Sequence, residues 1–173
     1  MHSQVNLIIV MGVSGCGKSS VAKTIAEELN YCFLEADDYH SDENKAHMAS
    51  GKPLTDAMRE PWIALLQAQL IQLSEKSQSV VMSFSGLRRE HREKMRELPL
   101  NSLFIHLDGE QNLISQRMTE RAGHYMPASL LDSQFAAMQA PSNTEQLHIV
   151  DIRPPLKTVI DSCKQVIQQE LSI

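Results

Sequence analysis

The chain has 173 residues, a length typical of one α/β domain and too short for two domains of ordinary size. Apolar residues make up 42% of it and charged residues 21%, which is the composition of a globular protein and excludes a disordered one. The formal net charge of −5 argues against a nucleic-acid partner, because binding to a phosphate backbone draws on clustered Lys and Arg. We therefore expect a single folded domain over residues 1–173.

The cysteines indicate a reducing compartment, and the apolar segments indicate neither a signal peptide nor a membrane span. Cys16, Cys32 and Cys163 are widely spaced and form neither a disulfide framework nor a zinc-binding pattern. The apolar run near the N-terminus lacks a basic segment before it and is broken at Gly12, so it does not read as a signal peptide. No apolar stretch reaches the roughly 20 residues that a membrane-spanning helix needs. These features predict a soluble, cytoplasmic protein without a membrane partner.

The predicted elements alternate between strands and helices. The apolar run Val5 to Val10 predicts a strand that is buried on both faces of a parallel sheet, and the helical spacing of apolar residues from Ser19 to Leu29 predicts a helix that ends at Asn30. Further strands are expected over 32–36, 80–84, 103–107 and 147–151, and further helices around 58–75, 88–97, 110–121, 128–139 and 155–170. This alternation predicts an α/β fold in which helices cover both faces of a parallel sheet.

Residues 12–19, GVSGCGKS, match the phosphate-loop signature G-x-x-x-x-G-K-[ST] between a predicted strand and a predicted helix, which is its required context. The glycines allow backbone N–H groups to surround an anion, and the helix N-terminus adds positive partial charge. Lys18 is expected to reach the β- and γ-phosphates of a nucleotide, and Ser19 to ligate Mg²⁺. The predicted nucleotide-binding residues of this loop are Gly12, Val13, Ser14, Gly15, Cys16, Gly17, Lys18, Ser19 and Ser20.

Cys16 leaves two interpretations open. A helix N-terminus favours the thiolate, so Cys16 fits a redox-sensitive thiol, but a small loop side chain without a chemical role is the preferred interpretation.

Carboxylates follow the second predicted strand, in the run Glu35-Ala-Asp37-Asp-Tyr-His40. Ligands of open α/β sheets bind at the carboxyl ends of the strands, where these side chains are expected. A carboxylate at that place can accept the proton of an attacking hydroxyl or hold Mg²⁺ through water. A solvated acidic turn is the alternative.

A regulatory GTPase would share the phosphate loop and the sheet. The guanine-reading Asn-Lys-x-Asp element is absent from the sequence, and no Asp-x-x-Gly element follows a middle strand. The chain length also favours a small-molecule kinase with an inserted acceptor site and an arginine-bearing lid.

The segment DDYHSDENKAHMASGKPLTDAMREPW, residues 37–62, resembles the acceptor-site signature of the gluconate kinase family, a branch of small P-loop kinases related in fold to shikimate and adenylate kinases. The likeness continues through 83–96, 107–141 and 150–156. It implies a P-loop NTPase fold with a five-stranded parallel sheet in the order 2-3-1-4-5, an acceptor region at about 37–62 and a lid at about 117–127. It also implies a homodimer that uses ATP and Mg²⁺ to phosphorylate D-gluconate to 6-phospho-D-gluconate.

The resemblance assigns roles to individual residues. Asp37 is expected to orient and deprotonate the 6-hydroxyl of gluconate, and Arg121 in the lid to neutralise charge on the transferred phosphoryl group, with Lys18 as the third catalytic residue. Residues expected to bind the substrate are Asp37, His40, Arg59, Arg88, Arg92 and His124. Arg88 and Arg92 stand at i and i+4 on one face of a predicted helix, so they are expected to grip the substrate carboxylate together from the wall opposite Arg59. Residues expected to extend the nucleotide site are Arg117, Arg153 and Pro155. Arg89 and Arg96 are assigned to solvent, and Trp62 to the core or to stacking on the substrate.

The chain departs from the family pattern at three places. Glu35 stands where the family usually has Asp, and it is retained as a Mg²⁺ ligand through water. Ala57 and Met58 stand where the family has acidic residues, and Ser85 to Arg88 read Ser-Gly-Leu-Arg where the family often has Ser-Ala-Leu-Lys. Two alternatives stay open: a kinase for another small hydroxy acid such as shikimate, and a nucleotide-binding module without turnover.

Overall fold

The computed structural model describes residues 4–120 and 128–173. Its sheet consists of β1 (Asn6–Met11), β2 (Cys32–Glu35), β3 (Val80–Phe84), β4 (Asn101–Asp108) and β5 (His148–Asp151). Every neighbouring pair of strands is parallel, and the order is β2-β3-β1-β4-β5. The predicted α/β fold, its parallel sheet and its strand order are confirmed.

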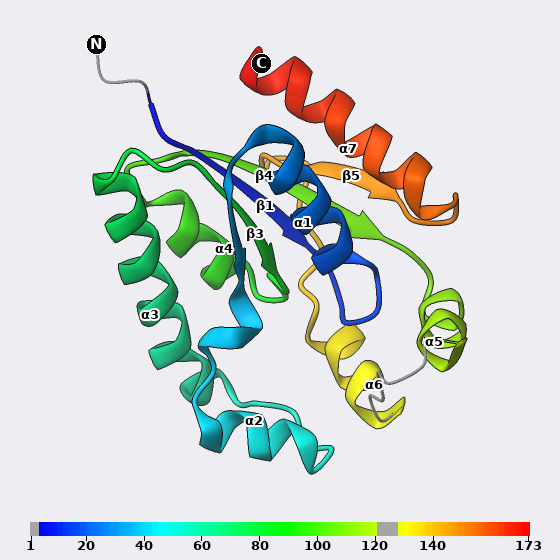
Figure 1. The fold of residues 1–173 in the computed structure, drawn as a ribbon. Helices are drawn as coiled ribbons and strands as arrows, with labels where there is room; N and C mark the ends of the chain where they lie inside the picture. Colours follow the sequence, from blue (N-terminus) through cyan, green and yellow to red (C-terminus); the bar gives the residue numbers. More distant parts are fainter. Residues whose placement is uncertain (1–3, 121–127) are drawn as a thin grey trace.

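Helices cover the sheet (Figure 1). They are α1 (Lys18–Leu29), α2 (Asp42–Ala49), α3 (Asp56–Glu75), α4 (Arg89–Arg96), α5 (Gln111–Glu120), α6 (Ala128–Ala137) and α7 (Leu156–Leu171), with a short 3-10 helix, η1 (Ala36–Tyr39). The predicted end of α1 is confirmed, because Asn30 adopts φ +56° and its N–H bonds back to Ala26 and Glu27. None of the helices in the described part of the chain combines the length and the hydropathy that a membrane span requires.

The segment 37–57 contains more regular structure than the sequence pattern predicts. The sequence predicts no helix between the strand over 32–36 and the helix around 58–75, yet this segment holds η1 and α2. Ser41 caps α2, since its Oγ accepts from the Asn44 N–H at 3.1 Å. The helix has almost no apolar face, so its capping residue, Ser41, is the only sequence feature that indicates it.

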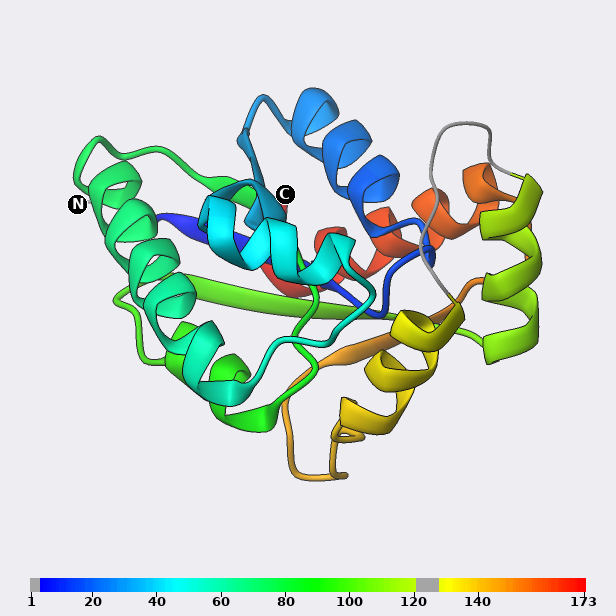
Figure 2. The ribbon, with the colours of Figure 1, turned by 90° about the horizontal axis from the view of Figure 1, so that it is seen from below.

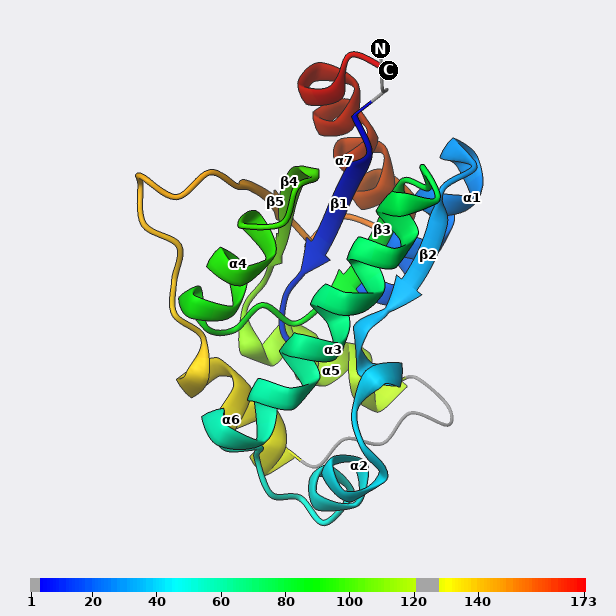
Figure 3. The ribbon, with the colours of Figure 1, turned by 90° about the vertical axis from the view of Figure 1, so that its left-hand side faces the viewer.

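The strand β1 is buried on both faces. Ile8 and Val10 pack under α1 and α7, while Leu7 and Ile9 pack under α3 and α4. Figure 3 shows these two helix pairs on opposite sides of the sheet. This double burial accounts for the continuous apolar run that predicts a central parallel strand.

The carboxyl ends of the strands carry the connections that concern function. Seen from below, α2 and α6 lie at the same end of the sheet as the loop between β1 and α1 (Figure 2). Ligands of parallel α/β sheets bind at this end.

Arg92 is the largest fully buried side chain, and its charge is balanced inside the protein. Its guanidinium donates to both carboxylate oxygens of Glu145, at 2.6 and 2.9 Å, and its remaining N–H groups donate to the carbonyls of Gly86, Leu87 and Gln139. All five donors are therefore used. The structure places Arg92 as a structural link between α4, the 86–87 turn and the 139–145 loop.

Arg96 joins the same cluster. It donates to Glu145 at 3.0 Å and to Glu93 at 2.8 Å, and its guanidinium lies 4.2 Å from the centre of the Phe104 ring. The assignment of Arg96 to solvent is therefore corrected, whereas Arg89 is exposed as expected.

Arg92→Met should lower the free energy of unfolding by about 3–5 kcal/mol, because it leaves the carboxylate of Glu145 buried without its main partner. Urea denaturation measures the change. Arg89→Met is the matched control, since it removes an exposed arginine three positions earlier and should cost under about 0.5 kcal/mol. A change below about 1 kcal/mol for Arg92→Met would contradict this account of the buried pair.

The same pair should stabilise the protein in a pH-dependent way. Hydrogen bonds from Arg92 lower the pKa of Glu145, so its contribution is complete above the ordinary carboxyl pKa of about 4.3 and is lost as the pH falls through the lower folded-state value. The stability difference between wild type and Glu145→Gln should be constant above about pH 5 and should shrink in more acid solution. Glu97→Gln, at an exposed position just after α4, should show a constant difference throughout. A wild-type advantage over Glu145→Gln that does not shrink in acid would contradict the linkage.

Candidate functional site

The phosphate loop has the backbone that its glycines permit. Gly17 precedes α1 with φ +94°, a conformation that other residues rarely adopt. A Cβ atom on Gly12 would lie 2.7 Å from the Cys16 Sγ and 2.9 Å from the Leu107 carbonyl oxygen, so only glycine fits there. Lys18 opens α1 and is buried, with its side chain on the wall of a neighbouring cavity. The loop therefore presents a helix N-terminus and a lysine to one place, as an anion site requires.

Oxygen ligands for a metal ion lie next to the loop. The Ser19 hydroxyl donates to Glu35 Oε2 at 2.5 Å and lies 3.2 Å from the Ser83 hydroxyl. Glu35 Oε1 is buried and has no hydrogen-bond partner among residues 4–120 and 128–173. Burial raises the pKa of this carboxyl, opposed by the hydrogen bond from Ser19. A hydroxyl beside a carboxylate with a free oxygen fits Mg²⁺, which takes few protein ligands when it binds together with phosphates. In residues 4–120 and 128–173, no group of three or more His, Cys, Asp or Glu could hold a metal alone.

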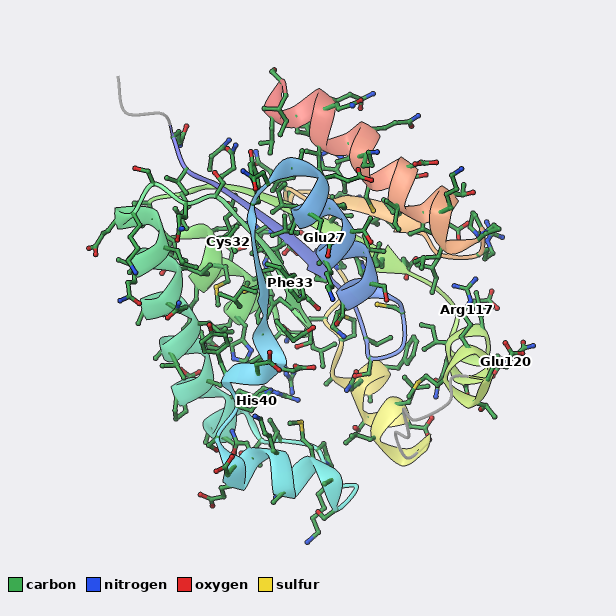
Figure 4. All side chains as sticks on the ribbon, viewed as in Figure 1. Glu27, Cys32, Phe33, His40, Arg117 and Glu120 are labelled. Atoms are coloured by element: carbon green, nitrogen blue, oxygen red, sulfur yellow. The ribbon has the colours of Figure 1, made fainter. Side chains whose placement is uncertain are left out.

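Two cavities open on opposite sides of the loop. One of about 420 Å³ is lined by Gly15, Cys16 and Gly17 of the loop, by Arg117 and by the start of α7. Figure 4 shows Arg117, on α5, and His40 on opposite sides of the loop between β1 and α1. Pro155 lines this first cavity as predicted for the nucleotide site. Arg153 does not line it, because its exposed guanidinium pairs with Asp151 at 2.6 Å, although its carbonyl accepts from Arg117 at 3.2 Å.

The second cavity, of about 550 Å³, brings the predicted acceptor residues to the phosphate loop. Lys18 and Ser14 of the loop line it together with Asp37, His40 and Arg59. Asp37 lies on η1 with an exposed carboxylate, 3.8 Å from His40 Nε2. A lysine for phosphate and a carboxylate for a hydroxyl thus line one cavity, which is the arrangement that phosphoryl transfer to an alcohol needs.

His40 is held by stacking rather than by surface contacts. Its ring lies on that of Trp62, with centroids 4.2 Å apart and an interplanar angle of 21°. Trp62 is itself buried, and its Nε1 donates to the Ala36 carbonyl at 2.8 Å. Burial lowers the pKa of His40, against the opposing effect of Asp37, so the neutral imidazole is the form present near neutral pH. Trp62 is both a core residue and part of the cavity wall.

The arginines that were predicted to bind the substrate lie in different places in the structure. Arg59 lines the cavity, and Asp56 bridges it to Arg88, at 3.4 Å and 3.3 Å. Arg88 precedes α4 in extended conformation, so it does not share a helical face with Arg92 as the i, i+4 spacing suggested. The structure does not bring Arg92 into the cavity, because Glu145 and backbone carbonyls take its donors.

Most of the predicted lid, residues 121–127, lies outside the described residues. Arg121 and His124 lie outside the described residues. Arg117 and Glu120, at the start of the same segment, belong to α5 and line the first cavity.

The helix α6 contributes residues that the sequence analysis did not single out. Leu130, Ser133 and Gln134 line the second cavity. Gln134 also contacts the phosphate loop: its Oε1 accepts from the Ser14 N–H at 2.7 Å and its Nε2 donates to the Ser14 Oγ at 3.0 Å. Leu130, Ser133 and Gln134 lie within the stretch 107–141 that carries the family resemblance, but their spacing along the helix did not indicate a chemical role.

The interpretation of Cys16 as a small, unreactive loop residue is supported by its environment. The side chain is 4% exposed, and burial raises the pKa of the thiol despite the nearby Lys18. A thiol held in the protonated form is a poor nucleophile.

Known proteins resemble this chain over most of its length. The AAA domain family profile matches residues 7–142. The gluconokinase of Gluconobacter oxydans is 41% identical over 80% of this chain and 78% of its own length. The chain belongs to the gluconokinase family. The thermoresistant gluconokinase of Escherichia coli is 35% identical over 95% of this chain and 94% of its own length.

Solved structures of kinases also superimpose on this chain. A gluconokinase from Sinorhizobium meliloti is 37% identical and superimposes with a TM-score of 0.86 over 96% of this chain and 94% of its own. A shikimate kinase from Bacteroides thetaiotaomicron, 20% identical, has a TM-score of 0.66 and shares the fold.

Thiol labelling should separate the cysteines. Cys32 is half-buried, whereas Cys16 and Cys163 are buried, and burial raises the pKa of Cys163 to about 12. We expect a disulfide reagent at pH 8 to modify Cys32 first and the other two only on unfolding. Mass spectrometry of the labelled protein locates the modified residues, and Cys32→Ser is the control that should remove the fast phase. Fast labelling of Cys16 would restore its interpretation as a reactive thiol.

Proposed function

We propose that this member of the gluconokinase family catalyses ATP-dependent phosphorylation of D-gluconate to 6-phospho-D-gluconate. The observation that carries the proposal is the second cavity, whose wall holds Lys18 of the phosphate loop and Asp37 together. Family relatives named gluconokinase support the choice of acceptor.

Each residue would act through a charge or a proton. Asp37 accepts the proton of the acceptor hydroxyl while that oxygen attacks the γ-phosphorus in line. The bond from the γ-phosphorus to the β,γ-bridging oxygen breaks, ADP leaves, and Lys18 neutralises charge on the transferred group. His40, stacked on Trp62, offers a neutral imidazole to the hydroxyls of the sugar acid. Arg59 provides a cation for its carboxylate. Arg121 is proposed to add positive charge from the lid.

The nucleotide would occupy the first cavity, with its phosphates on the loop. Arg117 and Pro155 line that cavity, and Arg153 stands beside Arg117. Mg²⁺ would be held by Ser19, with Glu35 beside it, and when bound it supplies charge neutralisation at the phosphates. We also propose that the protein is a homodimer in the cytoplasm. Gluconate is its small-molecule partner, and no nucleic-acid or membrane partner is proposed.

Asp37→Asn should lower kcat with gluconate at least about 100-fold while leaving the affinity for ATP within about threefold, because the amide cannot accept the proton. A coupled assay over a panel of sugar acids measures turnover, and binding of a non-hydrolysable ATP analogue measures affinity. Asp42→Asn, an exposed carboxylate in the first turn of α2, is the control and should retain wild-type activity.

The panel also tests the alternatives. Turnover of shikimate without turnover of gluconate would replace the proposed acceptor. ATP binding without acceptor-dependent consumption of ATP by the wild type would indicate a module without catalysis.

A further inference from the structure

The side chain of Gln134 joins the two halves of the site. It extends from α6, in the wall of the second cavity, to Ser14 in the phosphate loop, 120 positions away in the chain. Because the acceptor is proposed to bind there, this cavity is named the acceptor cavity. The two hydrogen bonds, at 2.7 and 3.0 Å, use both ends of its amide. Because a backbone N–H can only donate, the carbonyl oxygen of Gln134 must face it, and the NH₂ group then faces the Ser14 hydroxyl. The contact therefore fixes the amide in one orientation.

The contact also changes what the phosphate loop offers to a nucleotide. Backbone N–H groups of such a loop normally face the phosphates, yet the N–H of Ser14 faces Gln134. Ser14 follows Val13 in a turn that is closed by the bond from Cys16 N–H to the Val13 carbonyl, at 3.3 Å. Gln134 therefore holds this turn on the side of the acceptor cavity, while Gly15 and Gly17 line the first cavity, where the nucleotide is proposed to bind.

Gln134 lies where small displacements have large effects on rate. Lys18 and Ser14 of the loop line the same cavity as Leu130, Ser133 and Gln134 of α6. A shift of α6 relative to the loop would change the separation between the acceptor and the phosphoryl group. Misplacement of reacting groups by about 1 Å can cost about 100-fold in rate.

We propose that Gln134 is a positioning residue, which sets the distance between the acceptor wall and the phosphate loop by its paired hydrogen bonds to Ser14. This role rests on the proposed function, and it deepens it: Gln134 contributes to kcat without contacting the reacting atoms. It should also limit loss of the phosphoryl group to water, because a correctly placed acceptor competes with solvent.

Gln134→Met tests the role, since methionine has a similar length and cannot form either hydrogen bond. We expect kcat with gluconate to fall at least tenfold and the KM for ATP to change less than about threefold. ATP hydrolysed per gluconate phosphorylated should rise. Asp132→Ala is the matched control, because it removes the bond from Gln111 on α5 to the same helix without touching the loop, and it should leave kcat within twofold.

A double-mutant cycle makes the test specific to the pair. Ser14→Ala keeps the N–H bond and loses the hydroxyl bond, so it should lower kcat less than Gln134→Met does. In the Gln134→Met background, Ser14→Ala should have almost no further effect on kcat. Additive effects would overturn the proposal, and so would wild-type kcat in Gln134→Met accompanied by a lower Tm.

Turnover by the wild type and by Gln134→Met distinguishes failure of the proposed function from failure of the role of Gln134. Absence of gluconate phosphorylation by the wild type would overturn the proposed function and the positioning role together. Normal wild-type turnover with an unaltered Gln134→Met variant would overturn the role of Gln134 alone.

Discussion

Burial of β1 on both faces is the constraint on which the site depends. Its side chains alternate between two cores, one under α1 and α7 and the other under α3 and α4, so the strand cannot slide without exposing one of them. The phosphate loop leaves this strand at Gly12, whose N–H donates to the Ser85 carbonyl at 3.2 Å. Since β2 and β3 are aligned in register with β1, Glu35 and Ser83 end beside the loop. Strand pairing thus places the Glu35 carboxylate and the Ser83 hydroxyl beside the Ser19 hydroxyl.

Much of this arrangement could be predicted from the sequence, because it is encoded locally. An apolar run, a glycine-rich signature and a helical spacing occupy neighbouring positions, and their physical requirements do not depend on distant parts of the chain. The strand order could not be read from periodicity and came from the resemblance. The helix α2 was missed because its face is polar and its stability depends on the Ser41 cap and on the Asn44 side chain, which donates to the Met58 carbonyl at 3.0 Å.

The arginines show where a sequence argument fails. Spacing on one helix suggested that Arg88 and Arg92 form a pair, but α4 begins at Arg89. Arg88 pairs with Asp56 instead. Arg92 is buried because Glu145, 53 positions later, meets it with both oxygens. No local pattern identifies that partner. The exposed Asp56, by contrast, lies between Arg59 and Arg88 at distances above 3.2 Å, which is typical of a weak surface contact.

The buried cluster and the Gln134 contact together give the acceptor cavity a fixed frame. Arg92 holds the carbonyls of Gly86 and Leu87, and Leu87 lines the cavity, so the ion pair with Glu145 stabilises one wall. Gln134 fixes another wall to the phosphate loop. The stacked rings of His40 and Trp62 form a third, tied to η1 by the bond from Trp62 to Ala36. In phosphoryl transfer the protein contributes mainly position and charge, and in this chain interactions that lie away from the reacting atoms supply the position.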